Sequence, residues 1–392
     1  MANANFYNVE LRDKAGTLKA YLTPKAADVS WKWNRLGGCG RCTIKLQKEY
    51  RGIDFLGADD IQIRIRSGSA SKLVYRGWLS GVIPSLAEPE TITLNVRGYF
   101  DFLDYIIIHD GGDKKTYENM GISAIVDSIV DDFITTPTSI TKGTIDTASF
   151  SADKLEFRCK VSEALKTLAE IEGRVEYGVD ENLVFYWRAQ NRTLTHKFFI
   201  GDNVQVFERR MVWDNLVNKI YFEGGLVNDV PYIKISGATD SQTRHFLAEG
   251  LESNSAITTD GVATRFLSAK LKESAKTPLT LKVKILNTDI RIEDTIPVGR
   301  VGIFDADYDQ TLKKWGTTAN GGDNMIWGTL KNSGSGGVWG GMYKDQVSSI
   351  KYTLSNTEGR FNIELTFGGS LLDTSAKLKQ MDLLLSSLRQ RS

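Results

Sequence analysis

The chain of 392 residues carries 49 lysines and arginines against 48 aspartates and glutamates, so its net charge is close to zero. This balance excludes a strong overall field that would attract nucleic acid or an anionic membrane, although a local charged patch is compatible with it. The hydrophobic content of 41% and the charged content of 25% are ordinary for a folded protein and argue against long disorder. The length favours two to four domains.

The N-terminal residues lack the basic start and the apolar run of a signal peptide. No apolar stretch approaches the ~20 residues that cross a bilayer, so we expect no membrane span. The three cysteines form no even disulfide framework, and a chain of this size needs no disulfides. We therefore expect synthesis in a cytoplasm and reduced thiols.

The first part of the chain, from Phe6 to Val96, alternates apolar and polar residues with a period of two. Segments rich in turn-forming residues, at 14–16, 37–40 and 67–71, separate the alternating runs. Because the opposite face of every run is polar, the domain itself buries only one side of the sheet. The pattern predicts an antiparallel sheet or barrel.

The middle of the chain changes to a helical period. An apolar stripe from Ile122 to Phe133 predicts a helix, and a Thr- and Ser-rich connection from Thr135 to Phe150 follows it. The next stretch, Leu155 to Trp187, predicts a helix and then a hairpin. Ser162 is expected as the N-cap of that helix, and Gly173 as the left-handed residue after its end.

The hairpin is expected to alternate on both sides of turn residues between Gly178 and Asn182. A short helix and a two-stranded hairpin are each marginal alone, so each must bury its apolar face on the other or on the flanking strands. Residues from about Tyr99 to Ile200 are therefore expected to form a small α+β domain.

Strand patterning then resumes, and a second set of strands is expected at Val204–Phe207, Leu216–Gly225 and Val230–Ile235. A helix is predicted from Asp260, as the cap, to about Ser274. Further strands are predicted at Leu279–Ile285, Ile350–Leu354 and Phe361–Phe367.

A long Gly-rich segment from Asp305 to Tyr343 carries Trp315, Trp327 and Trp339. Its length favours a functional or partner-facing loop. Because tryptophan is favoured at protein interfaces, these residues are candidate partner contacts, and pinning of the loop to its own domain is an equal alternative. Stacking on a sugar or a base is a weaker third alternative.

The last residues, after Asp373, place four apolar side chains at steps of three, four and three, which is the spacing of a coiled-coil seam over two heptads. A helix packed on its own domain fits this pattern equally well. The candidate seam consists of Leu378, Met381, Leu385 and Leu388.

Motifs for catalysis, cofactors and metals are missing or incomplete. Cys39 and Cys42 have the spacing of a zinc or redox site, but no second pair accompanies them, so a turn with buried thiols is the better interpretation. Asp305, Asp307 and Asp309 resemble only the start of a calcium loop. Acidic pairs such as Glu208 with Asp214, and the histidines at 109, 196 and 245, select no catalytic site. We predict no catalytic residue, no cofactor and no bound metal.

The order of several stretches is similar to that of the tail hub of tailed bacteriophages, the baseplate hub family. The matching stretches span nearly the whole chain, and each is a loose pattern whose order carries the resemblance. They are IQIRI, VYRGWLSGVIPS and TITLNVRGYFDFLD in the first 104 residues, RVEYGVDENLVFYW and DNLVNKIYFEGG in the middle, and VSSIKYTLSNTEGRFNIELTFGG near the end.

The resemblance implies a mainly β protein in which two tube-type antiparallel β-barrel domains flank a small α+β domain. The expected domains are a first barrel at 1–98, the α+β domain at 99–200, a second barrel at 201–250 with 344–370, an inserted α+β region at 251–343 with the Gly/Trp-rich loop, and a C-terminal helix at 371–392. Many hubs of long flexible tails continue into fibre or peptidoglycan-cleaving regions, whereas this chain stops after one helix, so puncturing or cleavage would belong to a partner.

The function implied is that of a structural virion protein, a homotrimer that adapts the sixfold tail tube to the threefold tail tip during DNA ejection. Its partners would be a tail tube or distal tail protein on one side and a spike or fibre protein on the other, with DNA passing through unread. Residues Leu378 to Leu388 are the candidate contact with a partner or with sister subunits. The alternatives are a tail-associated cell-wall hydrolase and a receptor- or carbohydrate-binding module that uses the Trp-bearing loop.

Overall fold

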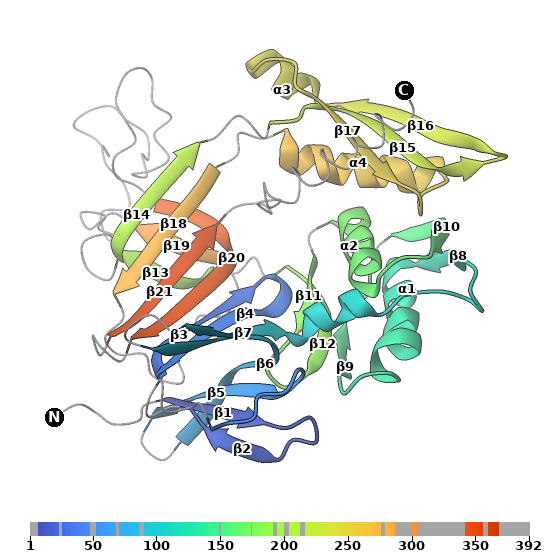
Figure 1. The fold of residues 1–392 in the computed structure, drawn as a ribbon. Helices are drawn as coiled ribbons and strands as arrows, with labels where there is room; N and C mark the ends of the chain where they lie inside the picture. The colour runs from blue at the N-terminus through green and yellow to red at the C-terminus, as the bar shows by residue number, and fades with distance from the viewer. Residues whose placement is uncertain are drawn as a thin grey trace, which may run out of the picture.

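The protein is mainly β, with large antiparallel sheets and few helices, as the sequence predicted (Figure 1). Within the part of the chain described here, no helix is long and apolar enough to span a bilayer. The computed structural model describes residues 7–22, 26–47, 52–67, 70–85, 90–148, 150–173, 175–190, 194–199, 204–211, 216–275, 279–286, 300–304, 342–355 and 360–367.

The first strand set forms one end of the largest sheet, in the order β3-β4-β7-β6-β5-β1-β2. Its alternating apolar residues, among them Val9, Ile63 and Tyr75, are buried in one core. The period-two alternation of the first 98 residues therefore corresponds to real strands whose apolar face lies in this core. The strands are β1 (Tyr7–Arg12), β2 (Leu18–Tyr21), β3 (Ala26–Asn34), β4 (Leu36–Gln47), β5 (Asp60–Ser67), β6 (Ala70–Ser85) and β7 (Thr91–Gly98).

A second strand set continues the same sheet through β20, which pairs with β3 from Ser349 opposite Asn34 to Ser355 opposite Asp28. Trp31 on β3 stacks on Tyr352 on β20 with ring centroids 5.1 Å apart, so aromatic packing reinforces this join. The two sets are thus one hydrogen-bonded sheet. The second set comprises β13 (Leu194–Phe199), β14 (Val204–Met211), β18 (Leu279–Leu286), β19 (Arg300–Phe304), β20 (Met342–Ser355) and β21 (Arg360–Phe367).

An α+β region follows the first strand set. The predicted apolar stripe is buried along α1 and continues into η4, a π-helix of 6 residues. The connection expected after it contains a short strand, β9. The elements are η3 (Tyr99–Tyr105), β8 (Lys115–Gly121), α1 (Ile122–Ile129), η4 (Val130–Thr135), β9 (Thr141–Ile145), β10 (Ser151–Phe157), α2 (Val161–Glu172), β11 (Val175–Val179) and β12 (Val184–Ala189).

The helix and hairpin predicted between Leu155 and Trp187 are present as α2, β11 and β12, with corrections at their ends. The N-cap of α2 is Lys160, and Ser162 lies inside the first turn, where its hydroxyl group donates to the carboxylate of Asp104. Gly173 ends the helix at φ +66°, as expected. Gly178 is part of β11, so the turn of the hairpin begins only at Asp180.

Glycines allow the first strand set and the α+β region to meet. β11 pairs in parallel with the start of β4, and Gly178 lies opposite Gly37. A Cβ on Gly178 would lie 2.4 Å from the backbone of Gly37 and Gly38, and one on Gly38 would lie 2.2 Å from the Val179 carbonyl oxygen. Residues 37–40 therefore belong to β4 and not to the turn predicted from their composition.

A third unit lies at the far end of the α+β region from the first strand set (Figure 1). A three-stranded sheet, in the order β16-β15-β17, covers α4, and α4 packs against α2. For example, Lys270 of α4 pairs with Glu170 of α2 at 2.8 Å. Its elements are β15 (Lys219–Val227), β16 (Val230–Gly237), α3 (Thr239–Arg244), β17 (Glu249–Asn254) and α4 (Asp260–Ser274).

This arrangement corrects the expected pairing of the middle strands. β15 and β16 pair with each other and with β17, so the expectation that they join the closing hairpin β20–β21 is wrong. β18 and β19, assigned to the inserted region from the sequence, pair with β21 and β20 in the large sheet. The helix at 260–274 has the predicted bounds, with Thr259 and not Asp260 as its N-cap. The division into five domains stays a prediction.

Candidate functional site

The three-stranded sheet has two apolar faces, of which α4 covers only one. On the covered face, Ile220 and Phe222 of β15 are buried, and the Phe222 ring lies 5.4 Å from the ring of Phe266 on α4. These residues belong to the same buried cluster as the helices of the α+β region. The unit is therefore anchored to the rest of the molecule through this face.

The opposite face, here called the outer face, consists of Tyr221, Leu226, Ile233, Ile235 and Leu251 together with the polar residues between them. The register places Ile235, Tyr221 and Leu251 side by side in one row across β16, β15 and β17. Ile233 is 70% exposed and Leu251 is 67% exposed. A row of large apolar side chains on a pleated sheet normally packs against another layer, and no described residue provides that layer.

Two neighbouring groups extend this apolar surface. Val227 and Val230 lie at the tip of the β15–β16 hairpin, and Phe246 and Leu247 lie just before β17. With the outer face they account for eight of the fourteen exposed large hydrophobic side chains in the described residues. Such concentration on one unit is unlike the scattered exposure of single apolar residues on ordinary surfaces.

Three polar groups at one end of the outer face, Lys219, Tyr221 and Glu249, are paired with one another. Lys219 Nζ lies 2.7 Å from Glu249 Oε1, and the Tyr221 hydroxyl group donates to the same carboxylate at 3.1 Å. These contacts lower the pKa of Glu249, first through the hydrogen bond from Lys219. The charged end of the face thus carries a compensated pair beside the aliphatic row.

A second, partly exposed group, here called the aromatic ridge, lies where β6 meets η3. It consists of Trp78 on β6, Phe102 and Tyr105 on η3, and Ile107 after it. The three rings lie 6.1–6.3 Å apart, with Trp78 edge-on to both others. Tyr105 is 64% exposed and Ile107 is 55% exposed. Clusters of this composition are typical of protein interfaces.

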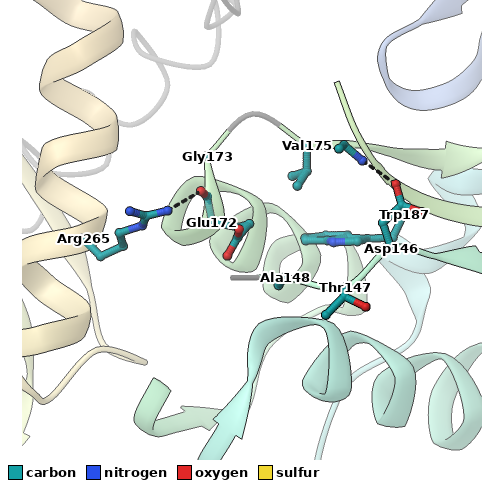
Figure 2. A pocket seen from close by; sticks show the side chains of 9 residues that line it. Asp146, Thr147, Ala148, Glu172, Gly173, Val175, Trp187 and Arg265 are labelled. Carbon is teal, nitrogen blue, oxygen red and sulfur yellow. Dashed lines mark hydrogen bonds between the residues drawn. The ribbon is translucent and has the colours of Figure 1, made fainter. Parts of the chain in front are cut away.

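A pocket of about 240 Å³ lies between the end of α2, the strand β12 and α4 (Figure 2). Arg265 of α4 reaches across and donates to the carbonyl oxygens of Ile171 and Glu172, both at 3.3 Å. A cation at the carboxyl end of a helix is favoured by the helix dipole. Asp146 accepts a hydrogen bond of 2.8 Å from the Ala189 backbone. These polar groups fasten elements together, and the geometry shows no nucleophile held beside a base.

The comparison with known proteins finds similarity in structure and none in sequence. No family model and no curated protein matches the sequence. Among solved structures, the 43 kDa tail protein of prophage MuSo2 from Shewanella oneidensis is similar with a TM-score of 0.58 at 13% identity, over 92% of this chain and 97% of that one. A tail protein from Neisseria meningitidis gives 0.60 at 10% identity, over 93% and 97%. The prophage tail protein gp18 from Listeria monocytogenes gives 0.53 at 9% identity, over 97% and 99%.

The chain has the fold of these tail proteins. The likeness extends over nearly the full length of every chain compared, so it includes both strand sets, the α+β region and the third unit. At identities of 9–13% the comparison concerns the fold alone.

Within this tail-protein fold, the cysteine pair is structural. Cys39 and Cys42 both lie in β4 with buried side chains, which agrees with the expected buried thiols and corrects the expected turn. Burial raises the pKa of Cys39 to about 12 and raises the pKa of Cys42 further. Neutral thiols are poor metal ligands and poor nucleophiles. Among the described residues, no group of three or more potential ligands gathers as a metal site.

The six interface residues predicted from the sequence, Leu378, Met381, Leu385, Leu388, Trp327 and Trp339, all lie outside the described residues, and so does the calcium-like run at 305–309. They stay predictions. Of the predicted acidic pair, Glu208 lies in β14 and Asp214 is outside the described part. His109 is exposed on the loop before β8.

Sequence reasoning missed the outer face and the aromatic ridge. The signal for the outer face was present in VPYIKIS, where Ile233 and Ile235 alternate with Tyr232 and Lys234, so that both faces of β16 carry apolar carbon. A strand with one face in solvent normally has a polar set there. The signal for the ridge was the aromatic run YFDFLDY directly after Gly98.

Proposed function

We propose that this chain is a structural tail protein that assembles as a homotrimeric hub between the tail tube and the tail tip. The observation that carries the proposal is the full-length likeness to tail proteins, which covers 92–97% of this chain and 97–99% of theirs. A partial match would have left the third unit unexplained. The same likeness supports a location in the tail of a virion, whose parts would be made in the host cytoplasm.

The continuous sheet offers a physical basis for symmetry matching. One subunit contains two strand sets joined edge to edge through β3 and β20. If the two sets act as similar blocks, three subunits present six of them, which suits a sixfold tube above and a threefold tip below. Backbone hydrogen bonds make the join between the sets rigid, so that each subunit would contribute both blocks in a fixed relation.

The role proposed is non-enzymatic. The assembly would serve as part of the DNA conduit, and the near balance of 49 basic and 48 acidic residues fits a wall that must release DNA. Its partners would be a tube or distal tail protein and a spike or fibre protein, bound through surfaces that a single subunit leaves open.

Light scattering of the purified full chain, over a range of concentrations, tests the proposal. We expect a stable species of three subunits, and we expect truncation after Leu372 to weaken it because the seam from Leu378 to Leu388 would hold sister subunits. A trimer that is indifferent to truncation would keep the hub and give that segment to another protein. A monomer at every concentration would contradict the proposed trimer.

A further inference from the structure

We propose that the C-terminal segment, residues 371–392, docks on the outer face of its own subunit and presents the seam to sister subunits. This inference deepens the proposed function and rests on it, because it names the surface that holds the seam in place in the trimer. It joins an apolar face that has no second layer among the described residues to a predicted helix that lies outside them.

The seam is too short to hold a trimer by itself. Its four apolar side chains, from Leu378 to Leu388, cover two heptads. Isolated helices shorter than about 12–15 residues are marginal in water, and a firm coiled coil takes about three or more heptads. The helix therefore needs a second surface that orders it.

The segment has a second apolar stripe on the side opposite the seam. With the seam residues at positions a and d of the heptad, Ala376 and Leu383 occupy position f, and Leu372 lies four residues before Ala376 on the same side. These three residues are here called the back stripe. The side of a surface helix opposite its apolar contact normally carries charged or polar residues. A leucine at position f therefore indicates a second contact.

The described chain ends close to the three-stranded unit. β21 ends at Phe367, which lies opposite Leu281 near the start of β18. Only four residues separate β18 from α4, which ends at Ser274. The Ser274 carbonyl oxygen accepts a hydrogen bond of 3.1 Å from Val217, two residues before β15. The segment thus starts where the chain crosses between the large sheet and this unit (Figure 1).

The segment is long enough to cross the outer face. Extended chain from Phe367 to Leu372 spans about 17 Å, and a helix from Leu372 to Leu383 adds about 16 Å. α4, which covers the opposite face, has 15 residues and is therefore about 22 Å long. A helix on each face would complete the same layer on both sides of the sheet.

The open apolar area suits one helix better than a whole subunit. The eight apolar side chains of the outer face and its two neighbouring groups are 42–70% exposed. They leave roughly 300–550 Å² in solvent, below the ~800 Å² per partner of a standard interface. At ~25 cal/mol per Å², a buried leucine covers on the order of 60–120 Å². The back stripe therefore covers about half of the open area.

Charge on the two surfaces is complementary. Glu223 is exposed on the outer face beside Ile233, whereas the pair at the end of that face is compensated. Lys379 lies at position b, beside the back stripe, so docking brings its ammonium group toward the Glu223 carboxylate. The segment has four basic and two acidic residues, namely Lys377, Lys379, Arg389, Arg391, Asp373 and Asp382.

Docking and trimer formation support each other. The back stripe is small, so in an isolated subunit its contact does not offset the entropy lost when the helix is ordered, and the outer face stays open. When three seams meet, the helix is ordered already, and its contact with the outer face adds to the association. The outer face then acts as a platform for the seam.

Cysteine cross-linking of the full-length trimer tests the placement. The background is Cys159→Ser, because the other two cysteines are buried. Leu251→Cys combined with Leu383→Cys should lose two thiols on oxidation with diamide, at the mass of one chain. Leu251→Cys with Leu385→Cys, on the seam side of the helix, is the matched control and should form no link within a chain. In the first variant, a link between chains or no link overturns the docking, and so does an in-chain link in the control.

A double-mutant cycle gives a second test. Ile233→Asp should weaken the trimer at least tenfold in light scattering, because it places a charge under the back stripe. Leu383→Asp should have a similar effect, and the double variant should be no weaker than either alone. Ile83→Asp is the control, since Ile83 is also exposed but lies on β6, and it should leave the trimer intact. Additive losses would show that the two positions act separately and would overturn the docking.

The outcomes separate this inference from the proposed function. A wild-type trimer that neither Ile233→Asp nor Leu383→Asp weakens overturns the docking and leaves the hub standing. A wild-type monomer at every concentration contradicts the proposed trimer and the docking that depends on it.

Discussion

The first strand set and the three-stranded unit both bury one sheet face, and they treat the other face in opposite ways. Behind the apolar core of β1, β5 and β6, the second face carries a ladder of charged and amide groups that bond to one another. Behind the apolar contact of β15 with α4, the second face carries aliphatic side chains in solvent. The contrast separates a face completed within the chain from one that is left for association.

The polar ladder is closed by short contacts. Asp60 accepts from Arg76 Nε at 3.0 Å, from Gln62 Nε2 at 2.8 Å and from the Tyr99 hydroxyl group at 2.9 Å. Glu10 accepts from Arg12 Nη2 at 2.8 Å. The carboxylates are buried although each arginine keeps part of its side chain in water. A buried network in which every member is bonded gives the face a single arrangement and no demand for a partner.

The largest effect we predict contrasts the two faces of one sheet. Phe222→Ala should lower the free energy of unfolding by about 3–5 kcal/mol, because it opens a cavity against Phe266. Ile233→Ala, in the next row of the sheet but on its exposed side, should change it by less than about 0.5 kcal/mol in the monomer. Urea denaturation of both variants at low protein concentration measures the difference. Equal losses would show that the outer face is already packed within the subunit.

The second prediction breaks the polar ladder. Asp60→Asn should cost about 2–4 kcal/mol, somewhat below the usual loss for a broken buried pair because Arg76 keeps access to water. The loss should appear in chemical denaturation at neutral pH. Glu118→Gln, an exposed carboxylate on β8, is the control and should stay within about 0.5 kcal/mol. If Asp60→Asn left the free energy of unfolding unchanged, the ladder would contribute nothing to stability.

Much of this fold could be predicted from residue patterns, since the fold class, the first strands, and the helices at 161–172 and 260–274 follow from the period, although both N-caps lie one or two residues before the predicted ones. The partners of the strands could not. Val204–Phe207 and Leu216–Gly225 show similar alternation, but one joins β18 and the other joins β16 and β17. Alternation specifies which face is buried, and long-range packing decides which strand lies alongside.

Glycine was misjudged for a related reason. Composition at 37–40 and at 178 indicates turns, because turns are where glycine is most often required. Here glycine is required because the backbones of β4 and β11 approach closely. The residues that meet there lie roughly 140 positions apart along the chain, so local composition does not reveal the contact. The aliphatic outer face was missed because the neighbours that alternate with Ile233 and Ile235, Tyr232 and the stem of Lys234, carry apolar carbon as well.

The third prediction addresses this junction. Gly178→Ala should lower stability by about 1–3 kcal/mol, the usual cost of forcing atoms into a packed site, because the new Cβ would meet the backbone of residues 37 and 38. Gly57→Ala is the matched control, since a Cβ there has open space. Thermal melting compares the two. If Gly178→Ala and the control have the same melting temperature, β4 and β11 can separate without loss of stability. The close glycine contact would then not hold the first strand set to the α+β region.

The smallest effect concerns alkaline pH and the buried side of the first strand set. Burial raises the pKa of Cys39 from 9.0 to about 12, so the folded chain retains a proton that the unfolded chain releases. Stability from this group is complete below about pH 9 and declines between pH 9 and pH 12, by on the order of 1 kcal/mol at pH 10. Wild-type protein should therefore lose more stability between pH 8 and pH 10 than Cys39→Ala does, in urea denaturation at both values. Equal losses would mean that Cys39 meets water in the native state. That result would mean that water reaches the core of the first strand set, as it reaches the outer face, and that this core is not closed in the way the polar ladder is.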